Sequence, residues 1–229
     1  MTVPIVRTID LSKTFEIGGH KVRALQRANL EVMPGEFVAI MGPSGSGKTT
    51  LLALVGCLDK PTEGRLFIDN VEVTSIPEAY LYRIRRDKIG FIFQSFNLIE
   101  NLSAAENVEL AMECSVGSRK QRNEKARELL DLVGLHDRDK HRPGQLSAGE
   151  QQRVAIARAL ANGPDIILAD EPTGNLDSET GLSIVNTLKQ LTTDQKCTVL
   201  MVTHDRLMAS AASRTLFIRD GIFVKEQIA

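Results

Sequence analysis

The chain has 229 residues, of which 42% are hydrophobic and 25% are charged, and its formal net charge is −1. A chain of this length and composition can bury a sizeable core without disulfides or metals, and its near-neutral charge argues against nucleic acid as a partner. Three scattered cysteines without a C-x-x-C pair indicate reduced thiols in the cytoplasm. The first residues carry no export signal, and the apolar runs are far shorter than the roughly 20 residues of a membrane crossing, so we expect no membrane span.

Short apolar runs alternate with helical patterns, which predicts an α/β fold around a largely parallel sheet. The expected strands are Phe37–Ile40, Leu66–Ile68, Ile89–Phe93, Ile166–Ala169 and Thr198–Val202. Near the end of the chain, two short apolar runs within residues 216–224 flank Asp220 and Gly221, which is a hairpin signal.

The middle of the chain has a different pattern. Residues 95–162 are helical in character, and the apolar positions 126, 129, 130 and 133 repeat with the helical period before Gly134, a typical C-terminal cap. The polar stretch Ser115–Arg127 is expected to be a surface loop that enters this helix. We therefore predict one domain over residues 1–229, with a helical subdomain (95–162) inserted between two parts of an α/β lobe (1–94 and 163–229).

Residues 42–50 read GPSGSGKTT and fit the phosphate-loop pattern G-x-x-x-x-G-K-[ST]. The motif requires a strand before it and a helix after it, and the sequence predicts both, the helix running from Lys48 to Leu58. Backbone N–H groups of such a loop surround phosphate oxygens, Lys48 would neutralise the β- and γ-phosphates, and the Thr49 hydroxyl would bind Mg²⁺. The predicted nucleotide-binding residues are Gly42, Pro43, Ser44, Gly45, Ser46, Gly47, Lys48, Thr49 and Thr50.

Two carboxylates follow the expected strand Ile166–Ala169. Asp170 lies where a buried strand ends, so its carboxylate can reach Mg²⁺ through water, and Glu171 can orient or deprotonate an attacking water. A strand that ends in Asp-Glu is common, so this assignment depends on the phosphate loop in the same chain.

A second candidate element is the sequence LSAGEQQ at residues 146–152. Ser147 and Glu150 fit the capping box S-x-x-E at the start of a helix that we expect to end near Leu160. The free N–H groups and the positive dipole end of that helix also attract phosphate. Capping and phosphate binding are compatible, so this helix can face the nucleotide of a second copy of the chain.

Together these residues resemble the ATP-binding-cassette (ABC) family, and the resemblance covers nearly the whole chain. The matching motifs are the phosphate loop Gly42–Thr50, the Q-loop glutamine Gln94, the signature Leu146–Gln151, the Walker B segment Ile166–Glu171, the D-loop Gly174–Asp177 and the switch histidine His204. Phe15 stands where the family places an aromatic that stacks on adenine. The resemblance implies a RecA-like P-loop NTPase lobe, an inserted helical subdomain and an N-terminal antiparallel β part.

The resemblance also implies a role for each motif in a homodimer that clamps two MgATP head to tail. The implied catalytic residues are Lys48, Gln94, Glu171 and His204, with Glu171 as the base. The implied Mg²⁺ ligands are Thr49, Gln94 and Asp170. Across the dimer, the resemblance implies that Ser147, Gly149 and Glu150 contact the partner's nucleotide. It also implies that Asp177 couples the two sites.

The function implied by the resemblance is ATP hydrolysis that drives a separate transmembrane permease from the cytoplasmic face of the membrane. Residues 90–98, 106–110 and 171–177 are most similar to the branch of lipoprotein-releasing, macrolide-exporting and cell-division ATPases, which favours an exporter of lipid, lipoprotein or peptide cargo. An ATPase that transmits force to a membrane partner without moving solute is the main alternative. A chromosome-maintenance ATPase would need a long coiled coil, and a translation ATPase would normally need a second cassette. A phosphotransferase would need an acceptor for the phosphate.

Ala148 and Glu150 depart from the usual signature Leu-Ser-Gly-Gly-Gln, whereas Gly149 is retained. Glu150 would place a negative charge near the partner's nucleotide, and like charges near a surface cost about 1 kcal/mol. We therefore expect weaker ATP-driven dimerisation than in the variant Glu150→Gln.

Overall fold

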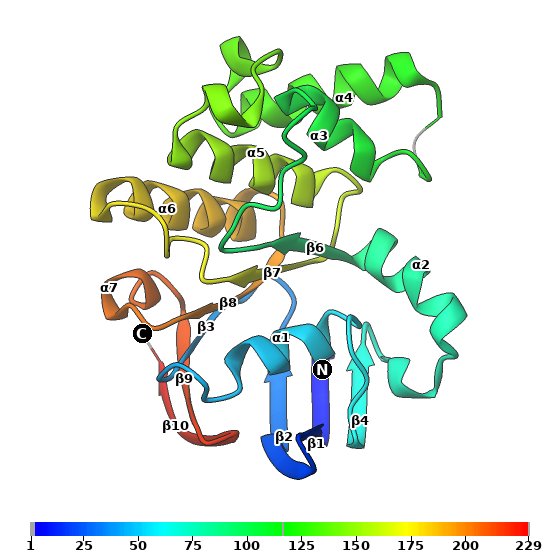
Figure 1. Ribbon diagram of the computed structural model, residues 1–229, viewed down its shortest axis with the longest axis vertical. Helices are drawn as coiled ribbons and strands as arrows, with labels where there is room; N and C mark the ends of the chain where they lie inside the picture. The colour runs from blue at the N-terminus through cyan, green and yellow to red at the C-terminus, as the bar shows by residue number, and fades with distance from the viewer. Residues whose placement is uncertain (1–2, 116, 229) are drawn as a thin grey trace.

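Two β-sheets and the helices packed on them organise the chain, of which the computed structural model describes residues 3–115 and 117–228 (Figure 1). The strands are β1 (Val6–Ile17), β2 (His20–Val32), β3 (Phe37–Met41), β4 (Glu63–Ile68), β5 (Val71–Glu72), β6 (Ile89–Ile92), β7 (Ile166–Asp170), β8 (Thr198–Thr203), β9 (Arg214–Arg219) and β10 (Ile222–Ile228). The helices are α1 (Lys48–Val55), α2 (Glu78–Lys88), α3 (Ala104–Ala111), α4 (Arg119–Leu132), α5 (Ala148–Leu160), α6 (Ser178–Asp194) and α7 (Arg206–Ala209). Short 3-10 turns form η1 (Val73–Ser75), η2 (His136–Arg138) and η3 (Pro143–Gln145).

The larger sheet has the strand order β10-β9-β3-β8-β7-β6 and is parallel except for the hairpin strand β10. Successive residues of β3 alternate between two cores. Val38 and Ile40 pack with α1 and the antiparallel strands, whereas Ala39 and Met41 pack with α3, α4, α5 and α6. Both faces of the sheet are covered, which explains why its strands read as apolar runs and confirms the predicted α/β class.

The smaller sheet has the order β2-β1-β4-β5 and is antiparallel, which confirms the predicted N-terminal β part. Helix α1 lies between the two sheets (Figure 1). Its residues Leu51, Leu54 and Val55 are almost fully buried in the core that the sheets share. The start of α1, and the phosphate loop before it, are therefore fixed by packing from both sides.

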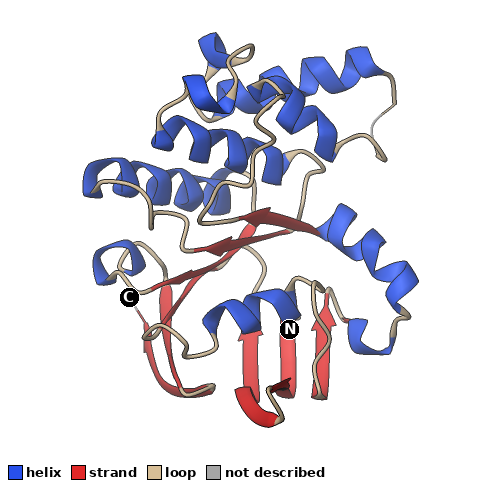
Figure 2. Cartoon of the chain, viewed as in Figure 1, coloured by secondary structure: helices blue, strands red, loops and turns tan. Residues whose placement is uncertain are grey.

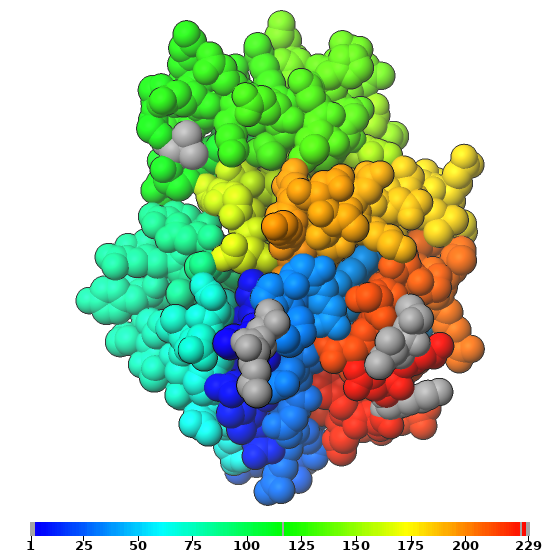
Figure 3. Space-filling model, turned by 180° about the vertical axis from the view of Figure 1, so that it is seen from behind, coloured from blue at the N-terminus to red at the C-terminus, as the bar shows by residue number. Residues whose placement is uncertain are grey.

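Helices α3, α4 and α5 pack on one another at one end of the molecule, beyond the β6 edge of the larger sheet (Figure 2). The space-filling view shows this segment, coloured green, as a projection above the rest of the chain (Figure 3). The helical pattern predicted for residues 95–162 agrees with these elements, and the division of the chain at residues 94 and 162 stays a prediction.

The predicted loop at 115–127 is wrong from Arg119 onward, because α4 begins there. Ser118 and Gln121 form a capping box, in which the Ser118 side chain accepts from the Gln121 N–H and the Gln121 side chain accepts from the Ser118 N–H. Most side chains of α4 face solvent, so its polar start resembles a loop in sequence. Gly134, with φ at +77°, follows the end of the helix, as predicted.

None of the helices in the described part of the chain combines the length and the apolar character that a bilayer span needs. Cys57 and Cys197 are buried and Cys114 is exposed, all three as free thiols. Burial raises the pKa of Cys57 to about 11. Cys57 is therefore protonated at neutral pH and belongs to the core.

Candidate functional site

The carboxyl ends of four neighbouring parallel strands meet at one edge of the larger sheet. Met41 of β3 is level with Thr203 of β8, and Asp170 of β7 is level with Val202 of β8. Each strand leads into one predicted motif: β3 into the phosphate loop, β6 into the Q-loop, β7 into the Walker B carboxylates and β8 into the switch histidine. This edge is where open α/β sheets bind their ligands.

A cavity of about 640 Å³ lies at this edge. Its walls are formed by Ala24, Pro43, Ser44, Gly45, Ser46, Gly47, Lys48, Thr49, Thr50, Gln94, Asp170, Glu171 and His204. The fold thus brings together the phosphate loop, the Q-loop glutamine, both Walker B carboxylates and the switch histidine, although these motifs are up to about 160 residues apart in the sequence. The predicted site residues that do not line this cavity are Phe15, Gly42, Ser147, Gly149, Glu150 and Asp177.

Glycine is required at two positions of the phosphate loop. Gly47 has φ at +102°, and a Cβ there would lie 2.2 Å from the carbonyl oxygen of Ala24. A Cβ on Gly42 would lie 2.2 Å from the carbonyl oxygen of Ile218 in β9. The loop therefore passes directly against the backbone of β2 and β9, and no side chain fits between them.

The phosphate loop brings hydrogen-bond donors and one positive charge close together. Lys48 is 7% exposed, and its Nζ donates to the carbonyl oxygens of Gly42 (2.8 Å) and Pro43 (3.0 Å), which holds the ammonium group over the loop. Ser46 Oγ is buried and has no hydrogen-bond partner within the described residues. A buried cation, an unused hydroxyl and the N-terminus of α1 together favour an anionic ligand.

Thr49 and Asp170 bring two oxygen donors together at the cavity wall. The Thr49 Oγ1 donates to Asp170 Oδ1 at 3.2 Å. Burial raises the pKa of Asp170, although the Thr49 hydroxyl opposes the rise. Hydroxyl and carboxylate oxygens suit Mg²⁺, but within the described residues no group of three acidic, histidine or cysteine side chains could hold a metal by itself. The donors fit a Mg²⁺ ion that takes further ligands from phosphate and water.

Glu171 occupies an unusual backbone conformation directly after β7. Its φ is +48°, in the left-handed region that costs a non-glycine residue about 1 kcal/mol or more. Its N–H donates to the carbonyl oxygen of Val202 at 3.0 Å, which holds the turn in place. Its Oε2 lies 2.8 Å from Nδ1 of His204, and the side chains of Glu171 and His204 are 16% and 69% exposed. The turn therefore directs the Glu171 carboxylate to the cavity, and the more exposed His204 imidazole lies beside that carboxylate.

The Q-loop is attached to the rest of the chain at several points. The Asn175 side chain donates to the carbonyl oxygen of Gln94 at 2.9 Å, and a Cβ on Gly174 would lie 2.7 Å from the Gln94 amide nitrogen. The Arg158 guanidinium, at the end of α5, donates to the carbonyl oxygens of Phe96 (2.7 Å) and Asn97. The segment that carries Gln94 is thus held by the D-loop on one side and by α5 on the other.

The signature residues lie at the start of α5 and away from the cavity. Ser147 Oγ accepts from the Glu150 N–H (3.2 Å) and Glu150 Oε2 accepts from the Ser147 N–H (2.8 Å), so the expected capping box is present. A Cβ on Gly149 would lie 2.5 Å from Cγ2 of Thr180, so glycine allows α5 to approach α6 closely. Asp177 caps α6 by accepting from the N–H groups of Glu179 (3.1 Å) and Thr180 (3.0 Å). Within a single chain, Ser147 and Asp177 therefore cap the starts of α5 and α6, and Gly149 allows the two helices to pack closely.

Phe15 lies in β1 opposite Val22 of β2, with the Lys13 ammonium group 5.0 Å from its ring centre. Ala24, two residues beyond Val22 in β2, lines the phosphate-loop cavity, whereas Phe15 does not. Adenine stacking on Phe15 stays a prediction.

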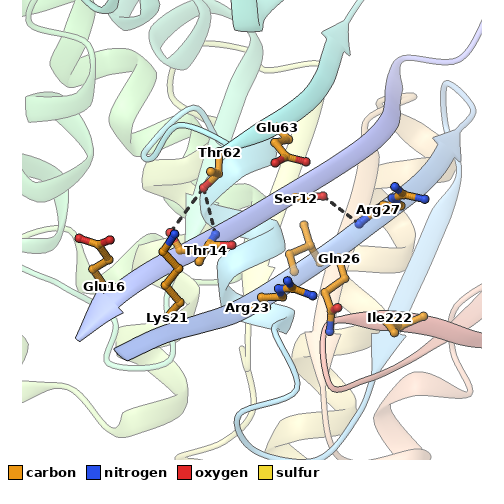
Figure 4. A pocket seen from close by; sticks show the side chains of 11 residues that line it. Ser12, Thr14, Glu16, Lys21, Arg23, Gln26, Arg27, Thr62, Glu63 and Ile222 are labelled. Atoms are coloured by element: carbon orange, nitrogen blue, oxygen red, sulfur yellow. Dashed lines mark hydrogen bonds between the residues drawn. The ribbon is translucent and has the colours of Figure 1, made fainter. Parts of the chain in front are cut away.

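A larger hollow, of about 910 Å³, lies along β1 and β2 (Figure 4). Side chains of both charges line it, including Glu16, Lys21 and Arg23 (Figure 4). The described residues that line it include no glycine loop and no helix N-terminus. We therefore assign the nucleotide to the smaller cavity, because its chemistry and not its size matches a triphosphate.

Three residues that line or support the site could not be assigned from the sequence. Ala24 lines the cavity but gives no signal in the sequence, because an alanine in a strand carries no reactive or charged group. Asn175 lies within the D-loop but was not assigned a contact with Gln94. Arg158 lies on the predicted signature helix, and a helical arginine in sequence gives no indication that it donates to loop carbonyls.

The site combines a glycine loop around a buried lysine at a helix N-terminus with two carboxylates and a histidine. This combination defines a P-loop nucleotide-binding protein. The family model described as ABC transporter matches residues 25–174. The chain is 49% identical over 227 residues to the uncharacterised ABC transporter ATP-binding protein MJ0796 of Methanocaldococcus jannaschii, covering 97% of each chain. It is also 47% identical over 223 residues to the macrolide export ATP-binding/permease protein MacB of Rhodospirillum rubrum, covering 97% of this chain and 34% of MacB.

A solved structure supports the same relationship. The dimeric structure of a post-hydrolysis state of the ATP-binding cassette MJ0796, bound to ADP and Pi, matches with a TM-score of 0.90 at 48% identity, covering 97% of this chain and 98% of that one. The chain belongs to the ABC transporter family and is an ATP-binding-cassette ATPase. The resemblance inferred from the motifs, and the branch that it indicated, are confirmed.

For a substitution at Gly47, the loss of stability from a steric clash can be measured separately from the loss caused by the positive φ. We predict that Gly47→Ala lowers the free energy of unfolding by roughly 3 kcal/mol or more and abolishes ATP binding, because the new Cβ meets the Ala24 carbonyl. The control is Gly163→Ala, at φ +63° with open space around it, which should cost about 1 kcal/mol and leave ATP binding unchanged. Urea unfolding and nucleotide titration measure both effects. Equal losses of stability in the two variants would contradict the close approach.

Proposed function

We propose that two copies of this chain hydrolyse ATP at composite sites, each formed by the phosphate-loop cavity of one copy and the start of α5 of the other. One observation carries the proposal. The signature residues Ser147 and Gly149 present a helix N-terminus, which is suited to phosphate, yet they do not line the cavity of their own chain. The dimer solved for MJ0796 with ADP and Pi supports this arrangement.

Within one copy, different residues bind the phosphates, the metal ion and the adenine. The phosphate-loop N–H groups and Lys48 bind the β- and γ-phosphates, and Thr49, Asp170 and Gln94 are placed to hold Mg²⁺. A Mg²⁺ ion held by these residues would neutralise part of the phosphate charge. Phe15 provides a ring for adenine at the outer side of β1.

Glu171 acts as the base. Its carboxylate takes a proton from the water that attacks the γ-phosphorus, the bond from that phosphorus to the β,γ-bridging oxygen breaks, and ADP and inorganic phosphate leave. His204, 2.8 Å from Glu171, orients the carboxylate and faces the γ-phosphate. The left-handed turn at Glu171 keeps the carboxylate pointed into the cavity while Asp170 stays in line with β7.

The variant Glu171→Gln tests the base. We predict that it binds ATP, hydrolyses it at least about 100-fold more slowly and accumulates as an ATP-bound dimer, because loss of a general base costs roughly 10²–10⁴-fold. Phosphate release and analytical ultracentrifugation measure the two effects. The matched control is Glu128→Gln, an exposed carboxylate of α4, which should leave both unchanged. A Glu171→Gln protein that hydrolyses at the parent rate would remove the assignment.

The partner that the dimer moves is, in this proposal, a transmembrane permease docked on the cytoplasmic face. A groove of about 330 Å³ lies between α2, β6 and the ends of α3 and α5. Phe91 and Phe93 form a stacked pair in it, with ring centres 5.7 Å apart, and Ala111 and Asn162 also line it. The groove continues into the Q-loop, so an apolar helix of a permease seated there would contact the segment that carries Gln94. The match to MacB, named as an ATP-binding/permease protein for macrolide export, supports a permease partner of an exporter.

A charge placed in this groove tests the docking surface. In Glu171→Gln protein recovered from detergent-solubilised membranes, we expect Ala111→Asp to lose co-purifying membrane subunits while ATP-driven dimerisation stays unchanged. The control is Leu132→Asp, on an exposed apolar position of α4 outside the groove, which should retain the partners. Retention by both variants would contradict the assigned surface. Solute flux in vesicles that contain the captured subunits separates transport from force transmission without transport.

A further inference from the structure

Both carboxylate oxygens of Glu150 are occupied within the chain. Oε2 accepts from the Ser147 N–H at 2.8 Å as part of the capping box, and Oε1 accepts from Nε of Arg138 at 3.0 Å. Arg138 ends the 3-10 turn η2, twelve residues before Glu150. The side chains of Arg138 and Glu150 are 45% and 28% exposed, so the pair lies at the surface that surrounds the start of α5.

The capping geometry determines what the start of α5 can offer to a partner's nucleotide. Ser147 Oγ accepts from the Glu150 N–H at 3.2 Å, which leaves the hydroxyl hydrogen of Ser147 free to donate to a phosphate oxygen. The hydrogen bonds from Ser147 and Arg138 lower the pKa of Glu150, so this carboxylate is charged at neutral pH. An uncompensated negative charge one helical turn from Ser147 would oppose the approach of a triphosphate.

We propose that Arg138 is a positioning residue of the composite site, which holds the Glu150 carboxylate in the capping box and neutralises its charge so that the signature helix can approach the partner's ATP. This inference rests on the proposed head-to-tail dimer. It also changes the expectation from the sequence that Glu150 weakens dimerisation, because that expectation took no account of a cation beside the carboxylate. With Arg138 in place, Glu150 provides the cap and adds little net charge.

A purely structural ion pair is the competing explanation, and the chain offers a matched example. Arg127 of α4 pairs with Asp139 at 3.2 Å in the same region of the fold, and its side chain is 54% exposed. Surface pairs of this kind contribute little to stability. If Arg138 only stabilised the fold, its loss and the loss of Arg127 would have similar, small effects on dimerisation.

A double-mutant cycle in the Glu171→Gln background distinguishes these explanations. We expect Arg138→Gln to weaken ATP-driven dimerisation about 25-fold, which is a factor of about five, that of one pair of like charges about 4 Å apart in water, at each of the two sites of the dimer. ATP binding by the monomer should stay unchanged. Adding Glu150→Gln should remove the defect, because the uncompensated charge is gone. Arg127→Gln should dimerise as the parent does. Sedimentation with ATP measures the dimer, and fluorescent nucleotide titration measures ATP binding.

Salt provides a readout that a structural role would not change. The defect of Arg138→Gln should shrink at about 0.5 M salt, where charges at the surface are screened within a few ångströms. The proposal is overturned if Arg138→Gln dimerises as the parent does, if its defect persists unchanged in the Glu150→Gln background, or if the defect is insensitive to salt. A parent Glu171→Gln protein that binds ATP but stays monomeric would instead refute the composite site itself.

Discussion

The register of the parallel strands is the constraint on which the rest of the structure depends. Because β3, β8, β7 and β6 run in the same direction and end level with one another, four motifs that are distant in the sequence meet at one edge of the sheet. Both faces of that sheet are buried, so a one-residue slip in register would exchange the side chains of a whole strand between the two cores, where they would no longer fit the packing. The burial of two cores therefore fixes the positions of Glu171, Gln94 and His204 at this edge.

Helix α5 links the signature to the rest of the cassette. Its first residue is capped by Ser147, Arg153 in the middle donates to Ser183 of α6, and Arg158 at its end donates to the backbone of the Q-loop. Burial lowers the pKa of Arg158, yet its hydrogen bonds to carbonyl oxygens keep it in place at the groove. This one element thus contacts the Q-loop at one end, and in the proposed dimer its other end would face a second copy. Such an element can transmit movement between the nucleotide and a membrane partner.

Most of the fold could be predicted because its signals are local. The apolar runs of the parallel strands, the glycine loop before α1 and the hairpin at Asp220 each lie within about ten consecutive residues. The start of α4 was missed because its polar residues face solvent and its capping box uses glutamine. The left-handed turn at Glu171 and the pair of Arg138 with Glu150 could not be predicted, since each depends on contacts that exist only once the chain has folded.

If one chain alone lacks a complete hydrolytic site, turnover of ATP must depend on the concentration of the protein. Phosphate release per chain should be measured across a dilution series, with sedimentation in the same samples to give the fraction of dimer. We expect turnover per chain to fall in proportion to the fraction of dimer and to vanish once all chains are monomeric. Turnover per chain that stays constant through the range in which only monomers are present would contradict it.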